Sequence, residues 1–146
     1  MPREITGFSN PLVKQVRGLR DKKNRRAEGL FLAEGLRILT EALDAGIPPK
    51  MLWHAPEGGA HPLVQKLARE TEATGGEVFV TSSDILSKLS GKDNPGAVIG
   101  VYPEMLTPLT ALDRATSGIW LVAERLRDPG NLGTILRTGD AVGAGG

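Results

Sequence analysis

Short apolar segments of strand-like composition alternate with helix-like segments over the first hundred residues. Glycine and proline separate most of them, as at Gly46 and Pro48-Pro49. This alternation is typical of an α/β domain, because each helix can cover a face of the sheet that the strands form. We predict strands at 31–33, 51–55, 78–81 and 97–102. We predict helices that start at Asn10-Pro11, at Leu36 and at residues 62–74 and 83–89, with a loop at 56–60.

The residue composition of the chain changes after residue 102. Residues 103–117 contain two prolines and several Ser and Thr, which indicates a linker. The apolar run Ile119–Ala123 then predicts a strand buried on both faces, followed by a turn and a helix from about Leu132. One such unit cannot form a sheet, so we expect residues 118–146 to be the start of a second domain, after a first domain at 1–102.

The composition excludes several classes of function. The chain has no cysteine, so disulfides, Cys-bound zinc and thiol catalysis are excluded. His54 and His61 have no further ligand at a metal-like spacing, and we expect no metal site. No apolar run approaches the ~20 residues that a membrane span needs. We therefore expect no membrane partner and a cytoplasmic location.

The net charge of +1 hides a strong asymmetry. Residues 14–26, called the basic segment below, carry seven cations and one acid, a net charge of +6; the rest of the chain, with eleven cations and sixteen acids, carries −5. Clustered cations bind phosphates and release counterions, which predicts a nucleic-acid surface; a solvated helix face is the alternative. The seven predicted RNA-binding cations are Lys14, Arg17, Arg20, Lys22, Lys23, Arg25 and Arg26.

The basic segment follows a predicted helix start. Asn10 is a favourable cap and Pro11 suits the first helical position, while Val13 and Val16 fall on the apolar side of the helix. We expect this amphipathic helix to run into a basic turn at 22–26. Only Phe8 and Phe31 flank the segment, which favours recognition of RNA backbone and shape over stacking on bases.

Two further patterns have a structural and a functional interpretation. Glu34-Gly35 lies where a strand meets a helix, which is typical of a cap and a turn, and Arg37 nearby either is an ordinary surface charge or faces RNA. Residues 124–138 combine a strand end, a Gly/Pro turn and a helix start, the place where open α/β sheets bind ligands. They match neither the dinucleotide nor the P-loop motif. The structural alternative makes Asp128 a turn residue and Asn131 a helix cap; a small-molecule enzyme with a phosphate site at the Gly130 turn is a third possibility.

The run from Asp128 to Thr138, continuing to Asp140-Ala-Val-Gly-Ala, closely resembles the first signature motif of a known family. This family is the SpoU/TrmH group of RNA 2′-O-ribose methyltransferases, within the SPOUT superfamily. The earlier residues resemble the substrate-binding domain that these enzymes carry in front of the catalytic domain. That likeness rests on Ser9-Asn10-Pro11 with Lys14, on the basic turn, on the run from Phe31 to Arg37, and on Asn94-Pro95, although Gly96 stands where Gln is expected.

The resemblance implies a small RNA-binding domain of the ribosomal-protein L30e-like type, followed by a methyltransferase domain that is knotted when complete. It implies S-adenosylmethionine as cofactor, structured ribosomal or transfer RNA as substrate, and a homodimer. By position, the catalytic residues are Asn131, Arg137 and Glu124. Arg137 is sometimes assigned as the base in this family. A guanidinium stays protonated at ordinary pH, so holding a phosphate and stabilising the developing alkoxide suits it better.

The second and third motifs of the family, which supply most of the cofactor pocket, are expected beyond Gly146. We therefore expect this chain to be the N-terminal part of a methyltransferase that binds RNA but transfers no methyl group by itself. The alternative is a stand-alone RNA-binding module without catalytic activity.

Overall fold

The computed structural model describes residues 2–93, 96, 98–113, 115 and 118–145. The chain divides into two compact units, Met1–Met105 and Leu106–Gly146, called unit 1 and unit 2 below. The division lies inside the predicted linker at 103–117, and the ends of the two predicted domains stay a prediction. Asn94, Pro95 and Ala97, which belong to a predicted turn and to the family resemblance, lie outside the described residues.

Unit 1 is built on a five-stranded mixed sheet with the strand order β1-β4-β3-β5-β2. β1, β4 and β3 are parallel, whereas β5 runs antiparallel to β3, and β2 is the antiparallel edge strand beside β5. β1 was not predicted, because it is three residues long and Ile5 is its only apolar residue, so the sequence shows no strand pattern there. The strands are β1 (Arg3–Ile5), β2 (Leu30–Glu34), β3 (Met51–His54), β4 (Glu77–Thr81) and β5 (Val98–Pro103).

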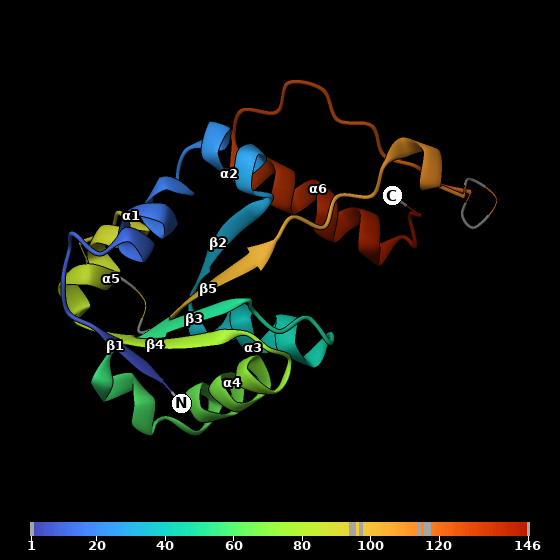
Figure 1. Cartoon of the computed structure of the whole chain (residues 1–146). Helices are drawn as coiled ribbons and strands as arrows, with labels where there is room; N and C mark the ends of the chain where they lie inside the picture. The colour runs from blue at the N-terminus through green and yellow to red at the C-terminus, as the bar shows by residue number, and fades with distance from the viewer. Residues whose placement is uncertain (1, 94–95, 97, 114, 116–117, 146) are drawn as a thin grey trace. The chain divides into compact units, whose positions relative to one another are not determined.

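Helices cover both faces of the sheet, which confirms the predicted α/β class (Figure 1). α1 and α5 pack against one face, and α3 and α4 against the other. The segment Pro56–Ala60, predicted as a loop, is a short 3-10 helix. Within the described residues, no helix has the length and apolar character that crossing a membrane requires. The helices are α1 (Pro11–Gly18), α2 (Lys22–Glu28), α3 (Leu36–Asp44), α4 (Pro62–Ala73) and α5 (Ser83–Ser90).

Alternate residues of the central strands enter two separate core layers. On the α1/α5 face, Trp53 stacks on Phe79 with ring centroids 4.5 Å apart. On the other face, Tyr102 packs near Leu39, and a side chain at Gly100 would overlap the tyrosine ring. Burial raises the pKa of Tyr102 to about 12, so its phenol stays protonated and acts as a core group. The two layers give unit 1 its own complete core.

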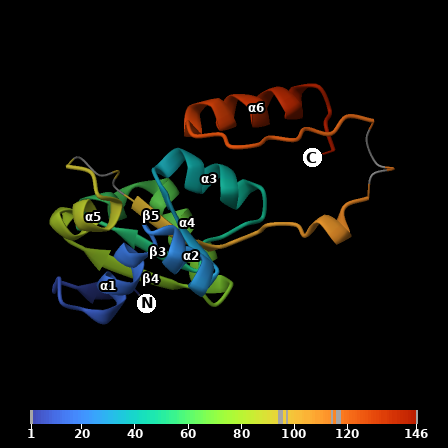
Figure 2. The ribbon, with the colours of Figure 1, turned by 90° about the horizontal axis from the view of Figure 1, so that it is seen from above.

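Unit 2 contains one short 3-10 helix, Leu109–Ala111, and the helix α6 (Pro129–Ala141). The predicted strand at Ile119–Ala123 is wrong: this segment is extended and runs alongside α6 (Figure 2), without a partner strand in residues 118–145. A strand needs a neighbouring strand for its ladder of hydrogen bonds, whereas the Ile119 carbonyl accepts the N–H of Gly145, a residue that follows α6 and is not in a strand, at 2.9 Å.

Truncating the buried leucine of α3 tests the core of unit 1. Leu39 is fully buried, so Leu39→Ala is expected to lower the free energy of unfolding by about 2–5 kcal/mol. Leu63→Ala is the control, because that side chain is 39% exposed, and the expected change is well under half as large. Urea unfolding followed by circular dichroism measures both. Equal losses for the two variants would contradict this description of the core.

Candidate nucleic-acid interface

The first half of the basic segment lies on the outer side of α1. The Asn10 side chain caps the helix by accepting a hydrogen bond from the Leu12 N–H at 2.9 Å, and Pro11 follows at the first helical position, as predicted. Val13 and Val16 are buried against the sheet. Because residues three or four apart share a helix face, Lys14 and Arg17 fall on the exposed side.

The second half of the basic segment is a helix, and the predicted basic turn at 22–26 is wrong. α2 starts after Asp21, whose backbone is extended, and it ends at Gly29, whose φ of 63° is left-handed. All of its residues are described and none is buried, so apolar burial does not hold it in place. Polar side chains do: the Asn24 Nδ2 donates to the Gly18 carbonyl at the end of α1, at 2.9 Å.

Arg25 is the second polar anchor between the two helices. Its Nη1 donates to the Leu19 carbonyl at 3.0 Å and to the Arg20 carbonyl at 2.7 Å. These carbonyls belong to the two residues that directly follow Gly18, the last residue of α1. Arg25 therefore positions α2 on α1, a role that differs from the phosphate contact predicted for it.

The charge of the basic segment is not neutralised by the protein. Among the described residues, no carboxylate lies within ion-pair distance of any of its seven cations. Glu28, the first acid after the segment, instead accepts a hydrogen bond from Gln15 at 2.6 Å. Outside the segment, Lys66 pairs with Asp44 at 2.9 Å. An uncompensated cluster of this kind raises the local positive potential and attracts an anionic partner.

Two open clefts border the basic segment. The first, of about 530 Å³, lies between α1 and α2 and is lined by Lys14, Arg17 and Arg20 together with Asp21 and Asn24. The second, of about 340 Å³, extends from Arg20 and Arg25 to the sheet. Arg20 lines both clefts, and its guanidinium lies over the backbone of Gly91, where a methyl group would overlap it.

Arg37 is not part of this cluster. It lies in the first turn of α3, its side chain is 92% exposed, and its Nε donates to Glu41 at 2.8 Å. That hydrogen bond and the charge of Glu41 raise the pKa of Arg37. The predicted contact between Arg37 and RNA stays a prediction.

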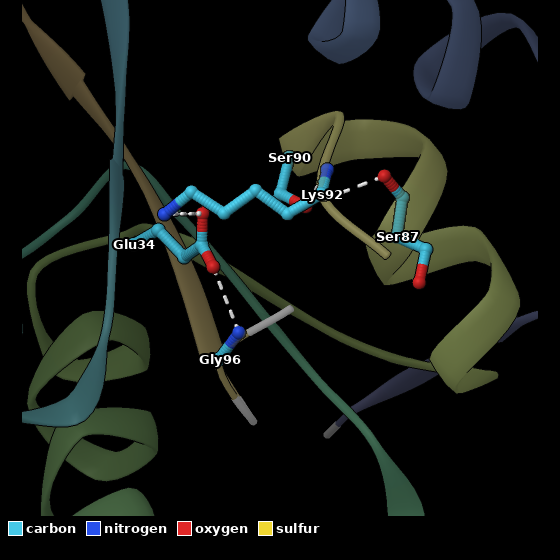
Figure 3. A network of polar contacts seen from close by, with 5 residues as sticks. All are labelled: Glu34, Ser87, Ser90, Lys92 and Gly96. Carbon is cyan, nitrogen blue, oxygen red and sulfur yellow. Dashed lines mark hydrogen bonds and ion pairs between the residues drawn. The ribbon is translucent and has the colours of Figure 1, made fainter. Parts of the chain in front are cut away.

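Glu34 does not cap α3, contrary to the simplest interpretation of its position. Its Oε1 accepts the Gly96 N–H at 2.8 Å and its Oε2 pairs with Lys92 at 3.0 Å (Figure 3). The Ser90 Oγ accepts the Lys92 N–H at 3.1 Å. Glu34 thus ties the end of β2 to the segment that joins α5 and β5. Sequence reasoning missed this function because the partners are far apart in the chain and leave no local pattern.

The motif residues of unit 2 are exposed and are not brought together. Asp128, rather than Asn131, caps α6, through a 2.8 Å bond from the Gly130 N–H. The Glu124 carboxylate lies 3.7 Å from Arg125, and Arg137 reaches Thr134 within its own helix at 3.4 Å. Within the described residues, no hydrogen bond or ion pair joins the three predicted catalytic side chains. Their assignment stays a prediction.

The described residues of unit 2 form an apolar hollow of about 270 Å³ between α6 and the preceding segment. It is lined by Leu121, Leu132 and Ile135, with Asp140 as its only acidic side chain. Other apolar side chains of unit 2 are exposed to solvent, and Val122 is 95% exposed. S-adenosylmethionine carries an amino-acid group and a ribose that need several polar partners. The residues that line the hollow do not supply them.

Comparison with known proteins places these features in a family. Residues 10–100 match the model described as the MRM3-like substrate binding domain, which covers α1 to the first half of β5. The chain belongs to this family. The match includes the whole basic segment and the Glu34 contacts, so both lie in the part that defines the substrate-binding domain.

Three relatives support the assignment. An uncharacterized tRNA/rRNA methyltransferase of Synechocystis is 37% identical over 97% of this chain and 50% of its own length. The 23S rRNA (guanosine(2553)-2'-O)-methyltransferase RlmP of Bacillus subtilis is 30% identical over 97% of this chain and 52% of its length. The AdoMet-bound rRNA methyltransferase of Sinorhizobium meliloti has 38% identity and a TM-score of 0.84, over 97% of this chain and 52% of that chain.

These findings confirm the resemblance to SpoU/TrmH methyltransferases and the predicted fold class. The chain spans about half the length of the curated relatives it matches. The likeness includes unit 2, because it extends over nearly all of this chain. The individual roles of the predicted site residues are not tested by it.

The two neighbouring arginines of α2 are expected to behave differently when they are replaced. Arg25→Ala removes both hydrogen bonds to the end of α1 and should lower stability by about 1–3 kcal/mol. Arg26→Ala removes an exposed charge and should change stability by less than about 0.5 kcal/mol. Thermal unfolding of the two variants measures this difference. Equal melting temperatures would show that Arg25 does not anchor α2.

Proposed function

We propose that this chain is the RNA-binding part of an S-adenosylmethionine-dependent ribose 2′-O-methyltransferase that acts on ribosomal or transfer RNA. The observation that carries the proposal is the uncompensated basic segment within the substrate-binding domain. The names of the relatives support the reaction, since they include rRNA and tRNA methyltransferases and a 2'-O-methyltransferase. The AdoMet-bound structure supports the cofactor.

The basic segment would bind the phosphate backbone of a folded RNA. Lys14, Arg17 and Arg20 border one cleft, and the hydrogen bonds of Asn24 and Arg25 hold α2 with its own cations in a fixed position beside it. A fixed arrangement of cations matches the regular spacing of phosphates better than a flexible tail does. Most of the affinity would then come from counterion release, with shape rather than sequence deciding which RNA binds.

The residues of unit 2 would contribute to the methyltransferase site. In an enzyme that also contains the polar residues the cofactor needs, S-adenosylmethionine would supply the methyl group. We propose that Arg137, protonated at ordinary pH, holds a phosphate near that oxygen and stabilises the developing alkoxide. Asn131 and Glu124 would orient the nucleotide through hydrogen bonds. We also propose a homodimer and a cytoplasmic location for the enzyme, as the family resemblance implies.

A stand-alone RNA-binding module is the second candidate. One observation favours it: the sheet of unit 1 is covered on both faces and has two core layers of its own. Such a unit can fold and bind RNA without a methyltransferase domain. The two candidates share the RNA-binding surface and differ only in methyl transfer.

The salt dependence of RNA binding tests this surface. The variant Lys22→Ala/Lys23→Ala/Arg26→Ala removes three cations of α2, so binding to a structured RNA hairpin should weaken. The slope of log K against log salt should become shallower by about 2 to 3, because fewer counterions are released. The matched control is Lys50→Ala/Lys66→Ala/Arg69→Ala, which removes the same charge outside the basic segment. Fluorescence anisotropy at several salt concentrations measures both. The same slope for the two variants would exclude the basic segment as the RNA surface.

A further inference from the structure

The second cleft beside the basic segment differs in chemistry from the first. Its floor is apolar, formed by Leu19, Phe31, Leu32 and Ile99, and Leu19 and Ile99 belong to the core layer under α1 and α5. Its rim is polar and carries Arg20, Arg25 and Glu34. Its volume of about 340 Å³ falls within the ~300–1,000 Å³ of small-ligand pockets. A phosphate gains nothing from an apolar floor, so the cleft suits a different part of the RNA.

From these features we infer that the cleft binds an unpaired guanine base of the RNA substrate. The inference rests on the proposed function, and it adds base recognition to a surface that the sequence assigned to backbone and shape alone. A base stacks on the plane of an Arg guanidinium as well as on an aromatic ring, and the cleft contains both groups, Arg20 and Phe31. The apolar floor then covers the second face of the base.

Arg20 is suited to this stacking role. Its guanidinium has no hydrogen bond or ion pair with another described residue, and the left-handed backbone of Gly91, with φ 75°, supports it from below. Arg20 also lines the cleft between α1 and α2. Arg20 therefore borders both the proposed phosphate site and the proposed base site. A nucleotide could place its phosphate in the first cleft and its base in the second.

Glu34 selects the base. A carboxylate only accepts hydrogen bonds, and each of its oxygens has two lone-pair positions. Gly96 and Lys92 use one position on each oxygen, so each oxygen can accept one further hydrogen bond. The Watson–Crick edge of guanine presents two adjacent donors, N1–H and N2–H, whereas the same edge of adenine presents one donor and one acceptor. The side chain is 17% exposed, which leaves it accessible from the cleft while its two protein contacts hold it in place.

Three RNA hairpins that differ at one position test the inference. One carries a single unpaired guanosine, one an unpaired adenosine, and one is fully paired. The chain is expected to bind the guanosine hairpin about tenfold more tightly than the paired one, as the stacking of one base allows. The adenosine hairpin should lie between the two. Equal affinity for all three would overturn the base site and leave the proposed function intact, whereas failure to bind any of them would overturn the proposed function itself.

Three variants locate the preference in the cleft. Leu32→Trp fills the floor from an edge strand and should bring all three hairpins to the affinity of the paired one. Glu34→Gln replaces one acceptor oxygen by a donor and should abolish the preference for guanosine over adenosine. Lys92→Met is the control, because it breaks the same ion pair and leaves the carboxylate. If Lys92→Met loses the guanosine preference to the same extent as Glu34→Gln, Glu34 acts only by holding the chain segment, and direct recognition is excluded.

Discussion

The docking of α2 onto the carbonyl end of α1 is the contact on which the proposed interface depends. α2 buries no side chain, so the hydrogen bonds of Asn24 and Arg25 to main-chain carbonyls hold it. The accepting carbonyls are those of Gly18, the last residue of α1, and of Leu19 and Arg20, which follow it. These hydrogen bonds engage Arg25, which is then not available to contact RNA. They also hold the other cations of α2 in fixed positions. The remaining cations stay free of carboxylates among the described residues and face the solvent.

The sheet explains why this arrangement can be rigid. Both faces are covered, and α1 is anchored through Val13 and Val16 on the same layer as Trp53 and Phe79. Opening that layer would expose large apolar side chains to water, which is costly. The charged helix pair thus rests on a stable core. Glu34 adds a second constraint at the other rim of the cleft, where it joins β2 to the segment before β5.

Local patterns predicted most of the fold and part of the candidate site. The cap at Asn10, the alternation of strands and helices in unit 1 and the cluster of cations are all visible along the chain, and the structure places them as expected. What the sequence could not show depends on contacts between distant residues. α2 was predicted as a turn because its stability comes from the end of another helix, and Glu34 was interpreted as a cap because its partner Gly96 follows much later. In unit 2, an apolar run alone predicted a strand at 119–123, but a strand also needs a neighbour, and the described residues provide none.

The proposed interface requires RNA to cover the basic segment and the cleft beside it and to leave Lys50 and Lys66 exposed. Chemical acylation of lysines, read by mass spectrometry with and without a saturating structured RNA hairpin, tests it most directly. Lys14, Lys22 and Lys23 lie in the segment, whereas Lys50 and Lys66 lie outside it. The account predicts strong protection of the first three by RNA and unchanged reactivity of the other two. Equal protection of all five, or protection of Lys50 and Lys66 alone, would contradict it.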